Sequence, residues 1–330
     1  MSEAELTHPC GRLMNVSEAA ERIGAGAWLW IAGDEALLRS LPRGHWIGGT
    51  TPYFMGQEGG KLSREQLFVT EVRVYGAQPW IRFHDVTSLA RVCVEAPEQG
   101  YSFLIIPAFS AVHSYYARNA PGFEDMFVKP VVGWVAGVHL DHLTNAAPGV
   151  INGETGVFDC ERALVMHVPL PDDHFARVEI VNLFEQGNGD RIRFPETGFS
   201  AGQCLINGQP AHLADYLSTH DIDLSLPLVA DYCGAMINVS FKGVDTASRR
   251  VDFYAPVFAD VEYRLARRRA GGVEPADAQQ SAFSCNCILN YLYDRLEGRR
   301  TGAFTGPVTF GEIAYLLLNQ TLVYLAIERV

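Results

Sequence analysis

The sequence predicts a mixed α/β (α+β) fold, a two-part domain with mixed sheets and flanking helices. The opening of the chain alternates between helical and strand-like patterns, which is typical of α/β proteins. Apolar strand-like runs then follow one another, and a turn-rich stretch interrupts the chain shortly before residue 200. A length of 330 residues suits two domains or one large one.

The first elements are delimited by local signals. Ser17 can cap an opening helix that Gly24 ends, and Pro42 stops a second short helix. Between and after these helices lie an apolar run that fits a buried strand and a strand that enters a glycine–threonine turn. The expected order is helix, strand, helix and strand, over residues 15–24, 27–32, 34–41 and 46–54.

Most of the remaining chain is expected to form strands. They fall at residues 102–106, 131–138, 162–168, 176–183, 235–241, 250–254, 281–285 and 321–327, with one helix at 211–218. The strand at 176–183 alternates polar and apolar residues, so one of its faces should meet solvent. The turn-rich stretch predicts a domain boundary, which gives an N-terminal extension over 1–19, a first domain over 20–198 and a second over 199–330.

Charge argues against two classes of partner. The chain carries 26 Lys and Arg against 38 Asp and Glu, a formal net charge of −12. Nucleic acid and anionic membranes attract basic surfaces, so neither is expected as a partner. One basic cluster exists and is expected to solvate a helix end: it consists of Arg264, Arg267, Arg268 and Arg269.

The sequence favours a cytoplasmic location. The N-terminal residues hold no apolar stretch able to act as a signal peptide, and no run approaches the roughly 18 apolar residues of a membrane span. The seven cysteines are odd in number and scattered, unlike a disulfide framework. We therefore expect a soluble cytoplasmic protein with reduced thiols.

Five segments in the second half carry a resemblance to a known family. They are Leu205-Ile-Asn-Gly-Gln-Pro-Ala, Ser225-Leu-Pro-Leu-Val, Phe283-Ser-Cys-Asn-Cys, Phe304-Thr-Gly-Pro-Val-Thr-Phe-Gly-Glu-Ile and Leu318-Asn-Gln-Thr-Leu-Val-Tyr-Leu-Ala. Two segments of the first half, Trp46-Ile-Gly-Gly-Thr-Thr and Val150-Ile-Asn-Gly-Glu, fit the same pattern. In order and spacing these segments resemble the FIST domain family of bacterial intracellular sensory domains.

The resemblance implies a two-part α/β sensor that binds a small molecule, with amino acids suggested as ligands and haem bound in at least one branch. Most relatives are fused to output modules, so here the signal would pass to a separate signalling protein. The chain departs from the family pattern at Cys287, where glycine is usual, and at Ile288, where arginine is usual. Gly49 also stands where the family often has cysteine. If these positions line a pocket, the departures predict a ligand less acidic than one that needs an arginine.

Five residues are the candidate ligand contacts of a cleft between the two halves: Thr50, Thr51, Cys285, Glu312 and Asn319. Thr50 and Thr51 end a strand, where open α/β sheets bind ligands. Glu312 lies in an apolar run, and a buried carboxylate needs a partner. Asn319 shares a strand face with Thr321 and could contact a ligand or pair across the sheet.

A cofactor-independent enzyme acting on a small carbonyl or acyl compound is the alternative function. Cys285 would be its nucleophile, and Glu312 or a histidine its acid or base. Cys285 and Cys287 share a strand face, where they could equally pack as small buried hydrophobes or line a pocket. The motifs Gly-x-Ser-x-Gly and His-Glu-x-x-His are absent, which removes the commonest hydrolase and metalloprotease interpretations.

No cofactor or metal is expected, although histidines leave two possibilities open. His139 and His142 could bind a metal if a helix placed them on one face, whereas on a strand they would point to opposite faces. A solvated pair at a strand end is the plainer interpretation. Haem needs only one axial histidine, and the candidates for that role are His84, His113, His139 and His167.

Overall fold

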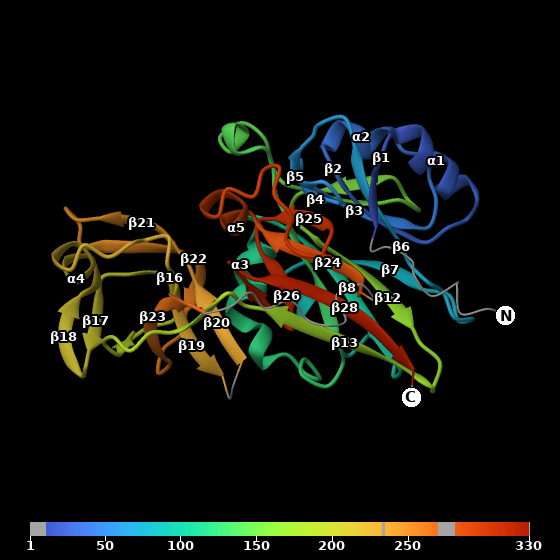
Figure 1. Ribbon diagram of the computed structural model, residues 1–330. Coiled ribbons are helices and arrows are strands. Elements are labelled where there is room, and N and C mark those ends of the chain that lie inside the picture. The colour runs from blue at the N-terminus through green and yellow to red at the C-terminus, as the bar shows by residue number, and fades with distance from the viewer. Residues whose placement is uncertain (1–10, 233–234, 270–280, 330) are drawn as a thin grey trace. The chain divides into compact units, whose positions relative to one another are not determined.

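The computed structural model describes residues 11–232, 235–269 and 281–329 (Figure 1). Contacts divide these residues into two compact units. The first unit holds residues 11–180, 281–317 and 322–329, and the second holds 181–232, 235–269 and 318–321. Strands run both parallel and antiparallel, so the mixed α/β class with mixed sheets is confirmed. None of the described helices is long and apolar enough to cross a membrane.

The units differ from the predicted domains at the boundary near residue 198. The turn-rich stretch before it contains β14 (Phe184–Gln186) and β15 (Ile192–Arg193), and both pair with a strand of the second unit. Later in the chain, residues 281–317 return to the sheets of the first unit. The predicted extension over residues 1–19 lies outside the described residues up to residue 10, and its remainder contributes a strand and part of a helix to the first unit.

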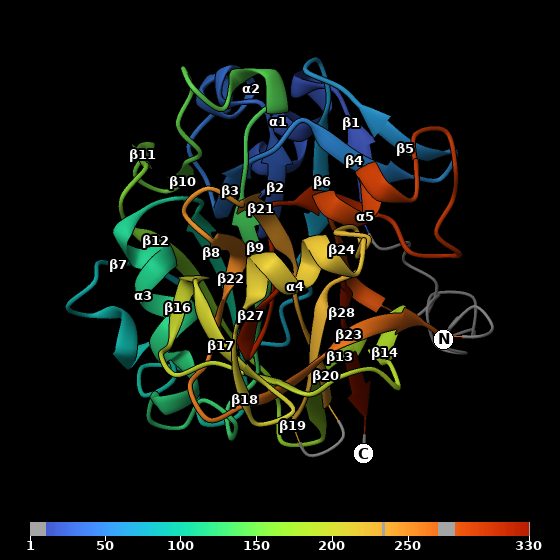
Figure 2. The same cartoon turned by 90° about the vertical axis from the view of Figure 1, so that its left-hand side faces the viewer.

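The first sheet of the first unit has six strands and one parallel pair, β2 with β3. Its order is β1 (Arg12–Met14), β6 (Leu67–Glu71), β2 (Leu29–Gly33), β3 (Trp46–Thr50), β10 (Val150–Asn152) and β11 (Val157–Asp159). Helices α1 (Val16–Gly24) and α2 (Glu35–Ser40) lie beside this sheet (Figure 2). Ile23 of α1 and Leu38 of α2 are buried in its apolar core.

The N-cap of helix α1 is Asn15, two residues before the predicted cap, Ser17. The side chain of Asn15, not Ser17, accepts a hydrogen bond from the Glu18 backbone N–H at 2.9 Å, and the Glu18 carboxylate accepts one from the Asn15 N–H at 3.0 Å. This reciprocal capping box satisfies two backbone donors. Glu18 lies three residues after Asn15 and only one after Ser17, so Asn15 is the residue that can use it.

The second sheet of the first unit has a buried centre, formed by β8, β9 and β12, and a half-buried edge strand, β7. Its order is β27 (Leu316–Leu318), β26 (Glu312–Ala314), β9 (Val131–Ala136), β8 (Gly100–Pro107), β12 (Ala163–Pro169) and β7 (Trp80–His84). Strands β8 and β9 are parallel, and their continuous apolar runs match burial on both faces. Helix α3 (Ala111–Asn119) packs against β8. The described residues also form the short 3₁₀ turns η2 (Leu89–Arg91), η3 (Ala120–Gly122) and η4 (Leu140–His142).

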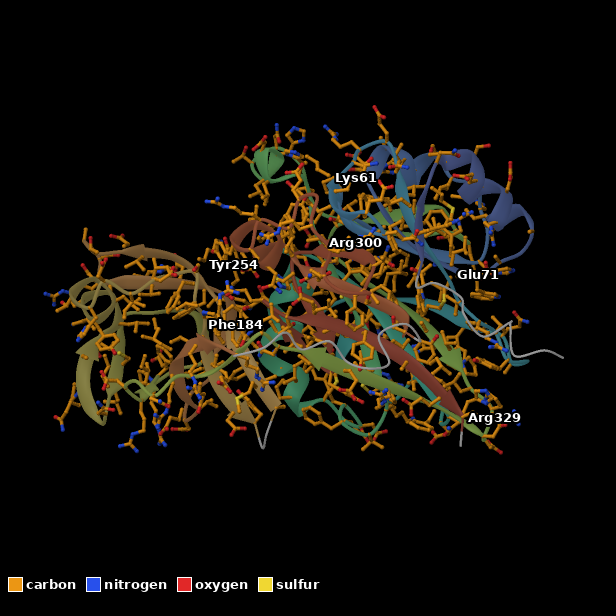
Figure 3. The ribbon with its side chains drawn as sticks, in the orientation of Figure 1. Lys61, Glu71, Phe184, Tyr254, Arg300 and Arg329 are labelled. Carbon is orange, nitrogen blue, oxygen red and sulfur yellow. The ribbon has the colours of Figure 1, made fainter. Side chains whose placement is uncertain are left out.

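The third sheet of the first unit combines strands that lie far apart in the sequence. Its order is β13 (His174–Val181), β28 (Leu322–Arg329), β24 (Ser281–Cys287), β25 (Gly306–Thr309), β4 (Tyr53–Gly56) and β5 (Gly59–Leu62), with helix α5 (Ile288–Tyr293) following β24. Strand β13 lies at the sheet edge and is mostly half-buried. Arg329 closes β28 and forms an ion pair with Asp173 at 2.9 Å (Figure 3).

The second unit has its own two sheets and core. The larger sheet runs β18 (Gln209–His212), β17 (Gln203–Ile206), β15, β23 (Glu262–Arg268), β19 (Leu228–Tyr232) and β20 (Ala235–Val239), with β14 also paired to β23. The smaller sheet is β16 (Gly198–Ala201), β22 (Arg250–Val257) and β21 (Phe241–Asp245), and the described part of this unit also contains helix α4 (Leu213–Thr219). Phe184, labelled in Figure 3, is fully buried in it.

The arginine cluster lies along β23 and at its end, so its expected position at a helix end was wrong. Arg267 forms an ion pair with Glu185 at 3.0 Å, and the Arg268 guanidinium lies 5.2 Å from the centroid of the Phe184 ring. These contacts follow from the pairing of β14 with β23, which brings residues distant in sequence to adjacent strands.

Candidate functional site

A small pocket of about 110 Å³ opens in the first unit. Its lining residues are Asp34, Glu35, Thr50, Thr51, Pro52, Arg64, Gly137, Val138, His139, His142, Ala146 and Ala147. Pockets for drug-sized ligands usually measure about 300 Å³ or more. This pocket therefore suits a molecule of only a few non-hydrogen atoms.

The pocket lies at the carboxyl ends of three strands, β2, β3 and β9. Gly33 ends β2, Thr50 ends β3, and Gly137 follows the end of β9. The Thr51 N–H donates to the Gly33 carbonyl at 3.0 Å, and the Gly137 N–H donates to the Thr50 carbonyl at 2.7 Å. These bonds hold the three strand ends together at the edge where open α/β sheets bind ligands.

Thr50 anchors both ends of the loop at residues 137–149, which carries His139 and His142. At one end its carbonyl accepts from Gly137, as above. At the other end its Oγ1 accepts from the Gly149 N–H at 2.9 Å, while its own N–H donates to the Gly149 carbonyl at 3.0 Å. Thr50 thus positions the loop as well as lining the pocket.

The two threonine hydroxyls differ in what they can offer a ligand. The Thr51 hydroxyl donates its proton to the Val308 carbonyl at 2.7 Å and accepts from the Tyr53 N–H at 3.3 Å. A hydroxyl has one proton to donate. Within the described part of the chain, the Thr50 hydroxyl only accepts, from Gly149, so its proton is available to a ligand.

Both carboxylates of the pocket are paired with arginines. The Arg64 Nε donates to Asp34 Oδ2 at 2.7 Å, and the Arg39 Nε donates to Glu35 Oε1 at the same distance. Arg64 lines the pocket and Arg39 does not. Arg64 reaches this position because the β4–β5 hairpin returns the chain to Pro52, whose carbonyl accepts from the Ser63 N–H at 2.8 Å.

The two histidines of the pocket lie close together around the turn η4. Their ring centroids are 5.2 Å apart. The Nδ1 of His139 accepts from the Asp141 N–H at 3.2 Å, so the neutral ring carries its proton on Nε2. Among the described residues, no third His, Cys, Asp or Glu joins them in an arrangement that could hold a metal ion.

Tyr53 packs beside this histidine pair. Its ring centroid lies 5.9 Å from that of His139, and its hydroxyl oxygen accepts from the Leu140 N–H at 3.1 Å. Burial, the largest cause, raises the pKa of the Tyr53 hydroxyl, so the group is neutral near pH 7. Tyr53 therefore holds the start of η4 in place rather than supplying a charge.

Cys285 and Glu312 lie against the same strand, β9, but neither lines the pocket. The Cys285 thiol is 3.6 Å from the Gly133 carbonyl, and its residue is 2% exposed. Glu312 is fully buried and pairs with Trp134 across β26 and β9. The structure thus brings these two candidates near each other, as the resemblance implied, in the interior of the first unit.

Asn319 belongs to the second unit and does not line the pocket. Its Oδ1 accepts hydrogen bonds from the Ser240 N–H at 3.0 Å and from the Ser240 hydroxyl at 2.6 Å. Of the two roles considered for this side chain, pairing within the fold is the one the structure shows.

Three of the histidines considered for haem are core residues. His84, His113 and His167 are at most 8% exposed. Burial lowers the pKa of His113 to about 4, and burial, followed by repulsion from His84, lowers the pKa of His167 to about 3. The His167 Nδ1 is also 2.9 Å from the Ser102 hydroxyl. Of the four histidines that left haem binding open, only His139 lines the pocket.

Sequence reasoning missed Asp34, Glu35 and Arg64 as pocket residues. Asp34 directly follows a buried strand, so the strand-end rule that selected Thr50 could have found it. No comparable signal marks Arg64, because only the β4–β5 hairpin carries it to the pocket. Gly49, in contrast, is explained by packing. A Cβ there would lie 2.6 Å from Ile105 Cγ2 and 2.8 Å from Trp134 Nε1.

The family described as "Family of unknown function (DUF6976)" matches residues 14–328, nearly the whole chain. The chain belongs to this family. No curated protein matches it. Membership of DUF6976 names no ligand or activity and does not test the resemblance to the FIST family, so the pocket itself is the basis for a functional proposal.

Proposed function

We propose that the protein binds a small polar molecule in the pocket at the ends of β2, β3 and β9, in a sensor-type role. The observation that carries this proposal is the convergence of hydrogen-bonding groups on one small space: the Thr50 hydroxyl proton and the rings of His139 and His142. Small-molecule sites combine concave shape with a few convergent polar groups. Thr50 holds the loop at residues 137–149 and also contacts the ligand, so ligand binding would affect the position of this loop.

The rest of the proposal rests on the sequence. The resemblance to the FIST family supports a cytoplasmic sensor whose signal passes to a separate protein. The net charge of −12 supports a partner other than nucleic acid. The enzymatic alternative has less support, because the Cys285 thiol is buried against β9 and away from the pocket. A reactive cysteine needs a partly exposed site that lowers its pKa.

The test compares the melting temperature of the protein across a panel of small polar compounds. A ligand at one hundred times its Kd stabilises the folded state by about 2.7 kcal/mol, or on the order of 5 °C for a protein of this size. His142→Ala should abolish this shift. His220→Ala, which changes a histidine on the second unit, should retain it.

Native and denatured masses of the freshly purified protein complete the experiment. A mass excess that is present in the native protein and disappears on denaturation would indicate a ligand that co-purifies. An equal shift in the wild type and in His142→Ala would exclude this pocket as the binding site.

A further inference from the structure

The carboxylates and the hydrogen-bond donors of the pocket differ in how many hydrogen bonds they already make within this chain. This difference indicates the charge of the ligand. Asp34 is engaged at both oxygens: Oδ2 accepts from Arg64, and Oδ1 accepts from the Ala36 N–H at 3.2 Å. Glu35 accepts from Arg39. Both oxygens of Asp34 and one oxygen of Glu35 therefore already accept hydrogen bonds from this chain's own donors.

The donors of the pocket are not used up. The Arg64 Nε donates to Asp34, and within the described residues the two Nη groups of Arg64 have no hydrogen-bond partner. The same holds for the ring nitrogens of His142 and for the Nε2 of His139. Together with the Thr50 hydroxyl proton, these groups make a site that can donate several hydrogen bonds to one ligand.

We propose that the ligand of this pocket is a small monocarboxylate, held by the free Nη groups of Arg64, the Thr50 hydroxyl and the ring of His142; this rests on the binding function proposed above. The planar guanidinium of arginine offers two parallel N–H donors that match the two oxygens of a carboxylate. A ligand amine would have to compete with an arginine at each carboxylate, because Asp34 and Glu35 both form ion pairs. The ligand is therefore an acid without an ammonium group.

The volume of the pocket limits the length of this acid. A space of about 110 Å³ is roughly a third of the smallest volume usual for the pocket of a drug-sized ligand. Acids of two or three carbons, such as acetate and propionate, are of this size. A longer acid would have to extend out of the pocket past Ala146 and Ala147, which are exposed at its rim.

Two arginine variants test the proposal in matched fashion. Arg64→Gln and Arg39→Gln each remove a half-exposed arginine whose Nε lies 2.7 Å from a carboxylate, but only Arg64 lines the pocket. Hydrogen bonds to charged groups are strong enough that losing Arg64 should weaken propionate binding by about tenfold or more. Arg39→Gln should bind propionate within about twofold of the wild type, and Arg64→Lys should restore part of the affinity.

Calorimetric titrations with propionate, propionamide, ethylammonium, glycine and inorganic phosphate separate the outcomes. Binding of propionate but not of its uncharged isostere propionamide, lost in Arg64→Gln, supports the proposal. Equal binding of propionamide, tighter binding of ethylammonium, glycine or phosphate, or full binding by Arg64→Gln would overturn it and leave a small-ligand pocket in place. If no probe binds and no compound of the wider panel shifts the melting temperature, the proposed function fails as well.

Discussion

At the scale of single residues, Thr50 shows how one side chain can serve both fold and site. Its hydroxyl oxygen accepts from Gly149, its carbonyl accepts from Gly137, and the residue lines the pocket. Thr51, its neighbour, uses its proton inside the fold. The sequence presented the two threonines as equivalent, and only their hydrogen-bond partners distinguish them.

We expect Thr50→Val to destabilise the protein by about 1–3 kcal/mol, because the buried Gly149 N–H loses its acceptor. Thr50→Ser keeps the hydroxyl and should cost less. Urea unfolding of both variants measures the difference. Equal stability of the two variants would show that the Gly149 hydrogen bond contributes nothing.

Gly49→Ala tests the packing around Trp134. The new Cβ would lie 2.6 Å from Ile105 Cγ2, and overpacking of this kind costs about 1–3 kcal/mol. Gly24→Ala is the matched control, because a Cβ at Gly24 meets nothing within 4 Å. Thermal unfolding should show a lower melting temperature for Gly49→Ala only. A variant as stable as the control would mean that the Trp134 side chain can move aside.

The buried histidines predict how stability depends on pH. Burial lowers the pKa values of His113 and His167 to about 4 and about 3, below the value near 6.5 expected in the unfolded chain. The unfolded state therefore binds more protons between these values. The stability contributed by these neutral rings is complete above pH 6.5 and falls as the pH decreases, by up to about 1.4 kcal/mol per pH unit for each histidine.

Urea unfolding at pH 7.5 and pH 5.5 checks this dependence in a range where most carboxylates remain ionised. The free energy of unfolding should be lower at pH 5.5. His167→Gln should show a smaller difference between the two pH values than the wild type does. A difference that is unchanged in this variant would assign the pH dependence to other groups.

At the scale of elements, helix α1 has two residues near its start that could serve as its N-cap. Asn15 and Ser17 are both good N-caps by residue type, but Asn15 alone has a glutamate at the third helical position. We expect Asn15→Ala to reduce the free energy of unfolding by about 1 kcal/mol and Ser17→Ala to have a much smaller effect. Chemical denaturation of the two variants measures this. A larger loss in Ser17→Ala would contradict the observed cap.

At the scale of the whole molecule, the chain does not divide at one point. Residues 281–317 and 322–329 return to the first unit, where β24, β25 and β28 form the middle of the third sheet. The second unit receives residues 318–321, and Asn238 donates to the Gln320 carbonyl at 3.1 Å. Each unit is therefore completed by segments distant in sequence.

A fragment of residues 1–198 should not fold cooperatively. It lacks β24, β25 and β28, so β13 and the β4–β5 hairpin lose their sheet partners. Exposed strand edges of this kind promote aggregation. Circular dichroism and thermal melting of the fragment, beside the full chain, provide the measurement. A cooperative transition like that of the full chain would show that residues 1–198 form a domain.

Local patterns determined the class of the fold and the place of most elements. The apolar runs at 27–32 and 131–138 predicted β2 and β9 to within two residues at each end, because a fully buried strand is apolar at consecutive residues. Thr50 and Thr51 were found by the same local logic. The sequence also predicted the adjoining helices α1 and α2 from caps and a stop at Pro42.

The tertiary structure alone decided which groups meet. Asp34 follows β2, Arg64 follows a hairpin, and His142 lies in the loop after β9, yet all three line one pocket with Thr50. Cys285 and Asn319, chosen with Thr50 from the sequence, lie elsewhere. Secondary structure follows from the pattern of neighbouring residues, whereas a site depends on the order in which strands pair. That order follows from burial across the whole sheet and not from any local segment.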